Sequence, residues 1–266
     1  LESGGPAEAI KLYDQILAAY PNYPHNDEVL YQKARALDEL GRVDEAVDVI
    51  ERLTAEFPYS AHLDEVQFRR AEYYFTRRKY RQAEDAYAAV RSLGAGSEYY
   101  ELALYKLGWT FYKQELHEEA LHEYIALLDH KVSTGYDFDH AVDEDEERRI
   151  ADTYRVVSLC FSNLGGPEQV DAYFAANGER SYEDRIYSRL AEFYLEKLRY
   201  QDAASAYGAF VALHPLHRVS PHFSMRVVEI YEAGGFPKLV LESKKAFAAN
   251  YGLQSEYWRH FDVREA

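Results

Sequence analysis

Cysteine, positive charge and long apolar runs are all scarce in this sequence. A single thiol, Cys160, excludes an internal disulfide framework. No apolar run approaches the roughly 20 residues of a membrane-spanning helix, and no signal-peptide pattern is visible. Acidic residues outnumber basic ones by 46 to 30, for a formal charge of -16. Such a surface repels phosphate groups, so nucleic acid and anionic membranes are poor candidates as partners.

Sequence motifs of catalysis are also missing. There is no phosphate-binding glycine loop, no Gly-x-Ser-x-Gly elbow and no His-Glu-x-x-His helix. His214, His217 and His222 are spaced loosely like metal ligands, but no thiolate supports them, and in a chain with ten histidines we expect no zinc site. Cys160 lies among apolar residues and is expected to be buried and inert. These features predict a protein that is not an enzyme and has no cofactor or metal.

What the sequence does contain is a repeat. The alanines at 9, 46, 83 and 120 follow one another at equal intervals of 37 residues. Larger apolar residues follow each alanine after four and seven positions, which is one face of an amphipathic helix. Small residues at 34, 71 and 108, again 37 apart, mark a preceding helix whose backbone can approach its partner closely. The pattern therefore predicts repeated pairs of antiparallel helices.

Helix-stopping residues fall between the expected helices. Tyr20-Pro21, Phe57-Pro58 and His214-Pro215 are expected to end pairs, because proline cannot continue a helix. Glycines at 41, 165 and 235 are expected at the turns inside pairs. Alternating β-branched residues are rare, so no strands are expected.

The third full unit resembles the tetratricopeptide repeat family, through Tyr105, Leu107, Gly108, Phe111, Tyr112, Ala120, Tyr124 and Leu127. The resemblance covers most of the chain. It implies an all-α, right-handed superhelical solenoid of antiparallel helix pairs, with about six to seven units. We predict regular units over 1–128, an acidic insertion loop over 129–149, degenerate units over 150–253 and the start of a truncated helix over 254–266. The chain opens at Leu1 inside a helix-pair pattern, so we expect a fragment of a longer protein.

First helices of such repeats line a concave side, which predicts a binding groove. Its residues, taken at helical spacing along three first helices, are Tyr31, Arg35, Phe68, Glu72, Phe75, Tyr105, Trp109 and Tyr112. Large amphipathic side chains in a groove favour capture of a peptide or helix from a protein partner. Tyr31 and Phe68 could instead pack between neighbouring first helices, whereas Trp109 is the stronger candidate for binding.

Some tetratricopeptide proteins hold the terminal carboxylate of a chaperone with lysines and asparagines. Here the corresponding positions carry Arg35 and Lys113, but mostly acidic residues such as Glu28, Glu65 and Glu72. The sequence departs from that clamp, so chaperone-tail binding is not expected. A partner with basic and apolar residues suits this groove better.

The insertion is densely acidic, with Asp137-Phe138-Asp139-His140 followed by Asp143–Glu147. It reads either as a solvated loop running into an acidic helix start or as a loop that contacts a partner or the groove. It lacks the Asp-x-Asp-x-Asp-Gly spacing of the calcium hand, so a calcium site is not expected.

The period of 37 exceeds the usual 34 of the family, and the extra residues are expected in the linkers between pairs. Linkers such as Tyr20-Pro21 and Phe57-Pro58 look like those of Gram-negative envelope repeat proteins, of the barrel-assembly lipoprotein and Tol–Pal coordinator type. That resemblance implies a periplasmic setting. Two alternatives stay open: a cytoplasmic regulatory scaffold attached to a catalytic domain outside this chain, and a solenoid that binds a small ligand or carbohydrate. The oligomeric state is not predicted.

Overall fold

The computed structural model describes residues 5–140 and 143–260. Within these ranges the chain is all-α: thirteen α-helices and one 3-10 helix, with no strand. The predicted fold class, a tetratricopeptide-like stack of helix pairs, is confirmed. The chain divides into two compact units, unit 1 over Leu1–Tyr136 and unit 2 over Asp137–Ala266, and each is described by itself.

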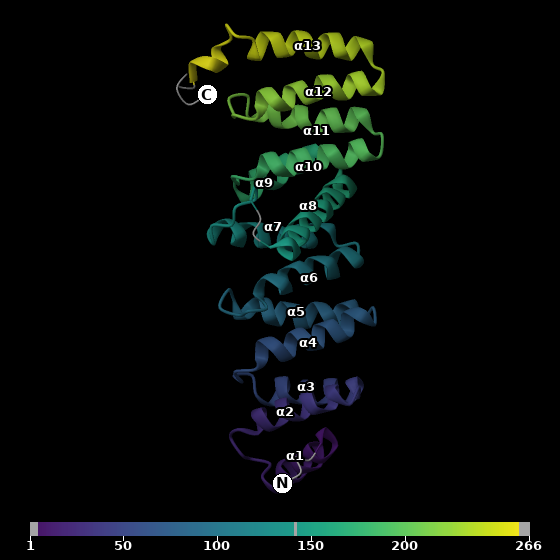
Figure 1. Cartoon of the computed structure of the whole chain (residues 1–266), viewed down its shortest axis with the longest axis vertical. Helices are drawn as coiled ribbons and strands as arrows, with labels where there is room; N and C mark the ends of the chain where they lie inside the picture. Colours follow the sequence, from purple (N-terminus) through teal and green to yellow (C-terminus); the bar gives the residue numbers. More distant parts are fainter. Residues whose placement is uncertain (1–4, 141–142, 261–266) are drawn as a thin grey trace. The chain divides into compact units, whose positions relative to one another are not determined.

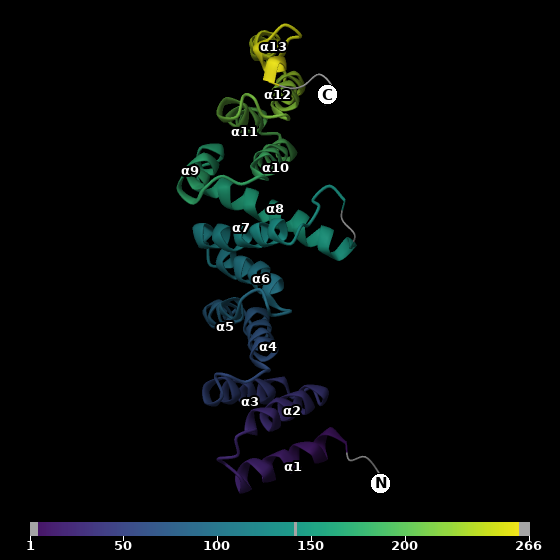
Figure 2. The same cartoon turned by 90° about the vertical axis from the view of Figure 1, so that its left-hand side faces the viewer.

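Unit 1 contains three helix pairs preceded by a single helix (Figure 1). Its helices are α1 (Pro6–Ala19), α2 (Asn26–Glu39), α3 (Val43–Glu56), α4 (Leu63–Thr76), α5 (Tyr80–Leu93), α6 (Tyr100–Lys113) and α7 (His117–Ser133). Each helix packs against the next one along the chain. Figure 2 shows the second helices α3 and α5 displaced to the left of the first helices α2 and α4.

The geometry of the pairs explains the period of 37. The helices α2 to α5 each have 14 residues, and three residues form the turn inside each pair, as in 40–42. Six residues link one pair to the next, as in 57–62. Each turn contains one residue with positive φ, namely Gly41 at 71°, Arg78 at 57° and Glu115 at 62°. Only glycine adopts this conformation without steric cost, so the turns at 78 and 115 are held by their flanking helices.

Close packing inside the pairs depends on small residues of the first helices. Ala34, Ala71 and Gly108 are all buried. At Gly108, a Cβ atom would lie only 2.7 Å from Cζ of the Tyr124 ring. Tyr124 follows Ala120 by one helical turn on α7, so glycine makes room for an aromatic ring of the second helix.

This packing predicts opposite effects for two glycine substitutions. Gly108→Ala should lower the free energy of unfolding by about 1–3 kcal/mol, because the methyl group overlaps a ring that is itself buried. Gly208→Ala, in α11, should raise it by about 0.5–1 kcal/mol, because nothing lies within 4 Å and alanine favours the helix. Urea unfolding of both variants measures the difference. Equal effects at the two positions would contradict the close contact at Gly108.

Unit 2 also contains three pairs. Its helices are α8 (Glu144–Leu164), α9 (Pro167–Asn177), α10 (Glu183–Glu196), α11 (Tyr200–Leu213), α12 (Ser220–Gly234), α13 (Pro237–Tyr251) and the 3-10 helix η1 (Glu256–His260). Within 254–266, where the start of a further helix is predicted, the structure has the 3-10 helix η1, and residues 261–266 of that prediction lie outside the described part of the chain. Cys160 is buried in α8, and burial raises the pKa of its thiol to about 12.

The segment predicted as an acidic insertion loop, 129–149, is helical at both ends. Residues 129–133 belong to α7 and residues 144–149 to α8. The Asp143 carboxylate accepts hydrogen bonds from the backbone N–H groups of Asp145 and Glu146, which caps α8 and explains why this acidic run starts a helix. Between the helices, Asp139 forms an ion pair with Arg185 at 2.9 Å. That contact attaches the segment to α10 of its own unit.

Candidate functional site

Tyr31 and Phe68, the first two aromatic residues of the predicted groove, lie in the core of unit 1. Only 7% and 9% of their surfaces are exposed. The ring of His62 stacks on Tyr31 at 3.8 Å, and the ring of Tyr99 lies 5.1 Å from that of Phe68. Both covering rings come from the linker before the next first helix. The two residues therefore pack between repeats, and their contact with a partner stays a prediction.

Glu72, also a predicted groove residue, connects three helices. Its carboxylate accepts a hydrogen bond from the buried hydroxyl of Tyr87 on α5. It also forms an ion pair with Lys106 on α6, with Nζ and Oε1 3.0 Å apart. Burial and this carboxylate raise the pKa of Tyr87, which keeps the phenol protonated and donating. Glu72 thus joins two successive repeats.

Unit 2 contains the same arrangement at identical spacing. Tyr207 donates to Glu192 at 2.7 Å, and Arg226 donates to the same oxygen at 2.7 Å. As in unit 1, the tyrosine follows the glutamate by 15 residues and the cation follows it by 34. The recurrence indicates that this contact belongs to the stacking of the repeats.

Five of the predicted residues, Glu72, Phe75, Tyr105, Trp109 and Tyr112, form with Lys106 and Lys113 a surface that we call the α4–α6 face. The ring centroids of Trp109 and Tyr112 are 5.5 Å apart and nearly perpendicular. Lys113 lies 5.3 Å from the Trp109 ring, and Lys106 lies 5.5 Å from the Phe75 ring. All four aromatic rings are partly exposed. Lys106 contacts Phe75 and lies three residues before Trp109 on α6, so Phe75 and Trp109 belong to one mixed aromatic and charged surface.

Tyr105 and Arg35 lie at the margins of this arrangement. The Tyr105 ring packs edge-on against that of Tyr124 at 6.2 Å, so it is anchored to α7. Arg35 on α2 is exposed, with its guanidinium 5.8 Å from the Tyr31 ring. The structure thus brings five of the eight predicted residues together on α4 and α6. Tyr31 and Arg35 lie on α2, and Phe68 lies on α4 but is buried.

A cavity of about 360 Å³ lies beside α4, between it and α3. The lining residues are Asp38, Val43, Val47, Ile50, Phe68, Arg69, Glu72, Tyr73, Thr76 and Arg77. Its walls are apolar where α3 faces Phe68, and ion pairs of Arg69 with Asp38 and of Arg77 with Asp44 stand at its margins. Phe68 and Glu72 belong to both the predicted groove and this cavity. A cavity of this composition suits an apolar side chain with polar neighbours.

Sequence reasoning missed Lys106 and the valines of α3. Lys106 lies one residue after a predicted aromatic position, and it interacts only because Glu72 and Phe75 of the preceding repeat lie opposite. Val43 and Val47 follow the helical pattern of α3, which identifies a buried face but not a cavity at its edge. The contacts of Lys106 and the cavity beside α3 both depend on the distance between neighbouring helices, which the sequence pattern does not give.

Metal ligands do not cluster in the part of the chain that the structure describes: no group of three or more His, Cys, Asp or Glu side chains there could hold a metal ion. His214 and His217 approach the same ring, Phe210, at 4.9 and 5.2 Å, whereas His222 lies against Phe223 at 6.3 Å. Among the helices of the described residues, none is long and apolar enough to cross a membrane.

Stacked helix pairs with a small residue at one fixed point of each helix define a class of helical repeat protein. Comparison with known families identifies the repeat family. Two models of the tetratricopeptide repeat match the sequence, one over residues 1–67 and the other over residues 68–134. Together they cover just over half of the chain, which belongs to the tetratricopeptide repeat family. No protein with a curated description matches the sequence.

Several solved structures are similar in fold. MamA is 18% identical, with a TM-score of 0.42, over 71% of this chain and 89% of that one. A tetratricopeptide repeat protein from Parabacteroides merdae is 13% identical, with a TM-score of 0.45, over 96% and 90%. PilW, described as a type IV pilus biogenesis factor, is 14% identical, with a TM-score of 0.38, over 88% and 97%.

Proposed function

We propose that this chain is a protein-interaction scaffold that binds a peptide or helix of its partner on the α4–α6 face. Tetratricopeptide repeats typically serve as non-catalytic scaffolds, and they present extended surfaces made by successive helices. The observation that carries the proposal is the grouping of Phe75, Trp109 and Tyr112, which are partly exposed and lie on two adjacent first helices.

The composition of the face defines the partner's chemistry. Aromatic rings with a polar margin are typical of binding hot spots. They bury a large area on binding, and because they have few rotatable bonds they lose little conformational entropy. The cavity between α3 and α4 would accept one apolar side chain beside this face. With a net charge of -16 on the chain, basic residues around that apolar group would speed association. The partner segment is thus amphipathic, with apolar anchors and basic neighbours.

We further propose that the chain is a piece of a cell-envelope protein of a Gram-negative bacterium. The support is the form of its linkers, Tyr20-Pro21 and Phe57-Pro58, each within the six residues that precede the first helix of a pair. Fractionation of cells that produce the tagged native protein tests this setting. Recovery with periplasmic or membrane markers is expected, and recovery with cytoplasmic enzymes would contradict it.

Site-specific crosslinking tests the binding face. A photoreactive phenylalanine analogue replacing Tyr112 should crosslink the partner, because this position lies beside Trp109. The same analogue replacing Arg52, which is exposed on the second helix α3, is the matched control and should give no such product. Mass spectrometry of the products identifies the crosslinked segment. Crosslinking that is stronger at position 52 than at 112 would place binding on the second helices instead.

A further inference from the structure

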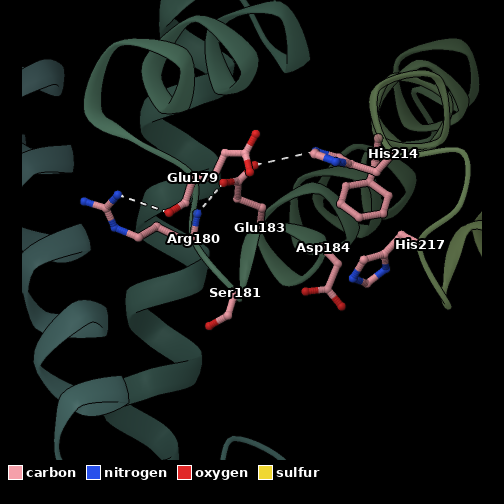
Figure 3. A pocket seen from close by; sticks show the side chains of 8 residues that line it. Glu179, Arg180, Ser181, Glu183, Asp184, His214 and His217 are labelled. Atoms are coloured by element: carbon pink, nitrogen blue, oxygen red, sulfur yellow. Dashed lines mark hydrogen bonds and ion pairs between the residues drawn. The ribbon is translucent and has the colours of Figure 1, made fainter.

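Besides the cavity beside α4 in unit 1, a cavity of about 300 Å³ lies in unit 2, at the start of α10 and the end of α11 (Figure 3). Its lining consists of Glu179, Arg180, Ser181, Glu183, Asp184, Phe210, His214 and His217. These side chains supply three carboxylates, one guanidinium and two imidazoles, and no part of the proposed function uses them. We call this cavity the Glu183 pocket.

Glu183 is the most buried carboxylate of this pocket, with 8% of its side chain exposed. Its Oε1 accepts a hydrogen bond from the backbone N–H of Arg180 at 2.5 Å. Its Oε2 lies 3.8 Å from Nε2 of His214, which is too far for a hydrogen bond, and it accepts none from the described residues. Burial raises the pKa of Glu183, so its ionised form lacks the solvation that it would have in water. A cation placed in the pocket would supply what is missing.

Of the cationic groups of the lining, His214 pairs with Glu183, but over 3.8 Å between Nε2 and Oε2 and only when its imidazole is protonated. The Arg180 side chain points away from the imidazoles (Figure 3), and its Nη1 donates to the backbone carbonyls of Asn177 at 3.0 Å and Gly178 at 2.6 Å. Burial, with smaller contributions from His214 and Arg218, lowers the pKa of His217 against the opposing effect of Asp184. A lowered pKa favours the neutral form of the His217 imidazole, which carries no positive charge to place beside Asp184.

We propose that the Glu183 pocket binds the guanidinium group of an arginine side chain from a protein partner. A guanidinium is planar and carries five N–H donors, so it can bond to the carboxylate of Glu183 and still offer donors to the other carboxylates of the lining. Its flat face can stack on an imidazole, and the rings of His214 and His217 line the pocket just beyond the end of α11 (Figure 3). A compact ammonium group offers neither the fork of donors nor the stacking face. The inference rests on the proposed function only in taking the ligand to be part of a protein.

The test uses the whole chain and a small probe, Nα-acetyl-arginine N-methylamide, with the lysine equivalent as comparison. NMR titration of the histidine ring signals should show binding of the arginine probe in the millimolar range, as expected for a ligand of this size, and at least fivefold weaker binding of the lysine probe. Glu183→Gln and Asp184→Asn should each weaken the arginine probe at least tenfold. Glu196→Gln, on the exposed side of the same helix, is the matched control and should leave it unchanged.

Thermal stability separates a binding pocket from a purely structural contact. Because the pKa of Glu183 is raised by folding, its contribution to stability is full below the unfolded pKa and is lost as the pH rises through the folded pKa. Glu183→Gln keeps the acceptor for Arg180 and removes the buried charge. It should therefore melt at the same or a higher temperature than the wild type at pH 7, although it binds the probe poorly.

The proposal would be overturned if the arginine probe did not bind, or if Glu183→Gln and Asp184→Asn bound it as tightly as the wild type. A melting temperature of Glu183→Gln below that of the wild type at pH 7 would also overturn it. A titration with Zn²⁺ covers the alternative ligand, and displacement of the arginine probe by equimolar zinc would also count against it. Trp109→Ala should leave probe binding intact, so failure of the α4–α6 face and failure of this pocket are distinguishable.

Discussion

Trp109→Ala is expected to weaken binding of the partner by roughly 30-fold, which corresponds to about 2 kcal/mol. Trp109 lies at the middle of the α4–α6 face, with the Tyr112 ring on one side and Lys113 over its face. Removing the indole deletes the largest apolar surface there and leaves the neighbouring cation without its aromatic contact. Surface plasmon resonance with a peptide of the partner segment that crosslinking identifies measures the change. The change should appear mainly in the dissociation rate.

The second tryptophan of the chain is the control. Trp258 lies in η1 of unit 2 and is 39% exposed, with its Nε1 donating to the carbonyl of Tyr251 at 3.2 Å. Trp258→Ala removes a side chain of the same size from a surface outside the face. It should leave the dissociation constant within about twofold of the wild type, and a loss equal to that of Trp109→Ala would indicate a binding surface in unit 2 instead.

Tyr87→Ala is expected to lower the free energy of unfolding by about 3–5 kcal/mol, the range for truncation of a large buried ring. Tyr87 is fully buried in unit 1. Its ring packs edge-on against Phe68 at 5.7 Å and Phe75 at 6.4 Å, and its hydroxyl donates to Glu72. The substitution therefore leaves a void between α4 and α5 and removes one contact from a carboxylate that joins two repeats. Urea unfolding followed by circular dichroism gives the value.

Two variants separate the causes. Tyr87→Phe keeps the ring and removes only the hydroxyl, so it should cost about 1 kcal/mol, since Lys106 still neutralises Glu72. Tyr59→Ala truncates a tyrosine that is 96% exposed and should change stability by less than about 0.5 kcal/mol. A loss of similar size in Tyr87→Phe and Tyr87→Ala would show that the hydrogen bond, rather than packing, dominates.

The helix pairs were predictable from the sequence because their signal is local. Alanines 37 residues apart, with apolar residues one and two turns later, identify the helices, and the six-residue linkers follow from proline and the helix lengths. The acidic run at 143–147 was ambiguous on composition alone. Its outcome depends on one capping carboxylate, that of Asp143, which fixes the first turn of α8.

The binding face could be predicted only in part, because helical spacing does not distinguish an open ring from a covered one. Tyr31 and Phe68 occupy the same register as Tyr105. They are buried, with the rings of His62 and Tyr99 from the following linkers against them, whereas Tyr105 is partly exposed. The Glu183 pocket was not predicted, since His214 lies 31 residues beyond Glu183 and meets it only after α10 and α11 have folded against each other.

The central claim is that the partner binds across α4 and α6 through Phe75 and Trp109. Isothermal titration of the partner segment against the wild type and the Phe75→Ala/Trp109→Ala double variant tests it most directly, with circular dichroism confirming that both are folded. At least about 100-fold weaker binding by the double variant is expected, since two anchors of one hot spot are lost. A folded double variant that binds within twofold of the wild type would contradict the claim.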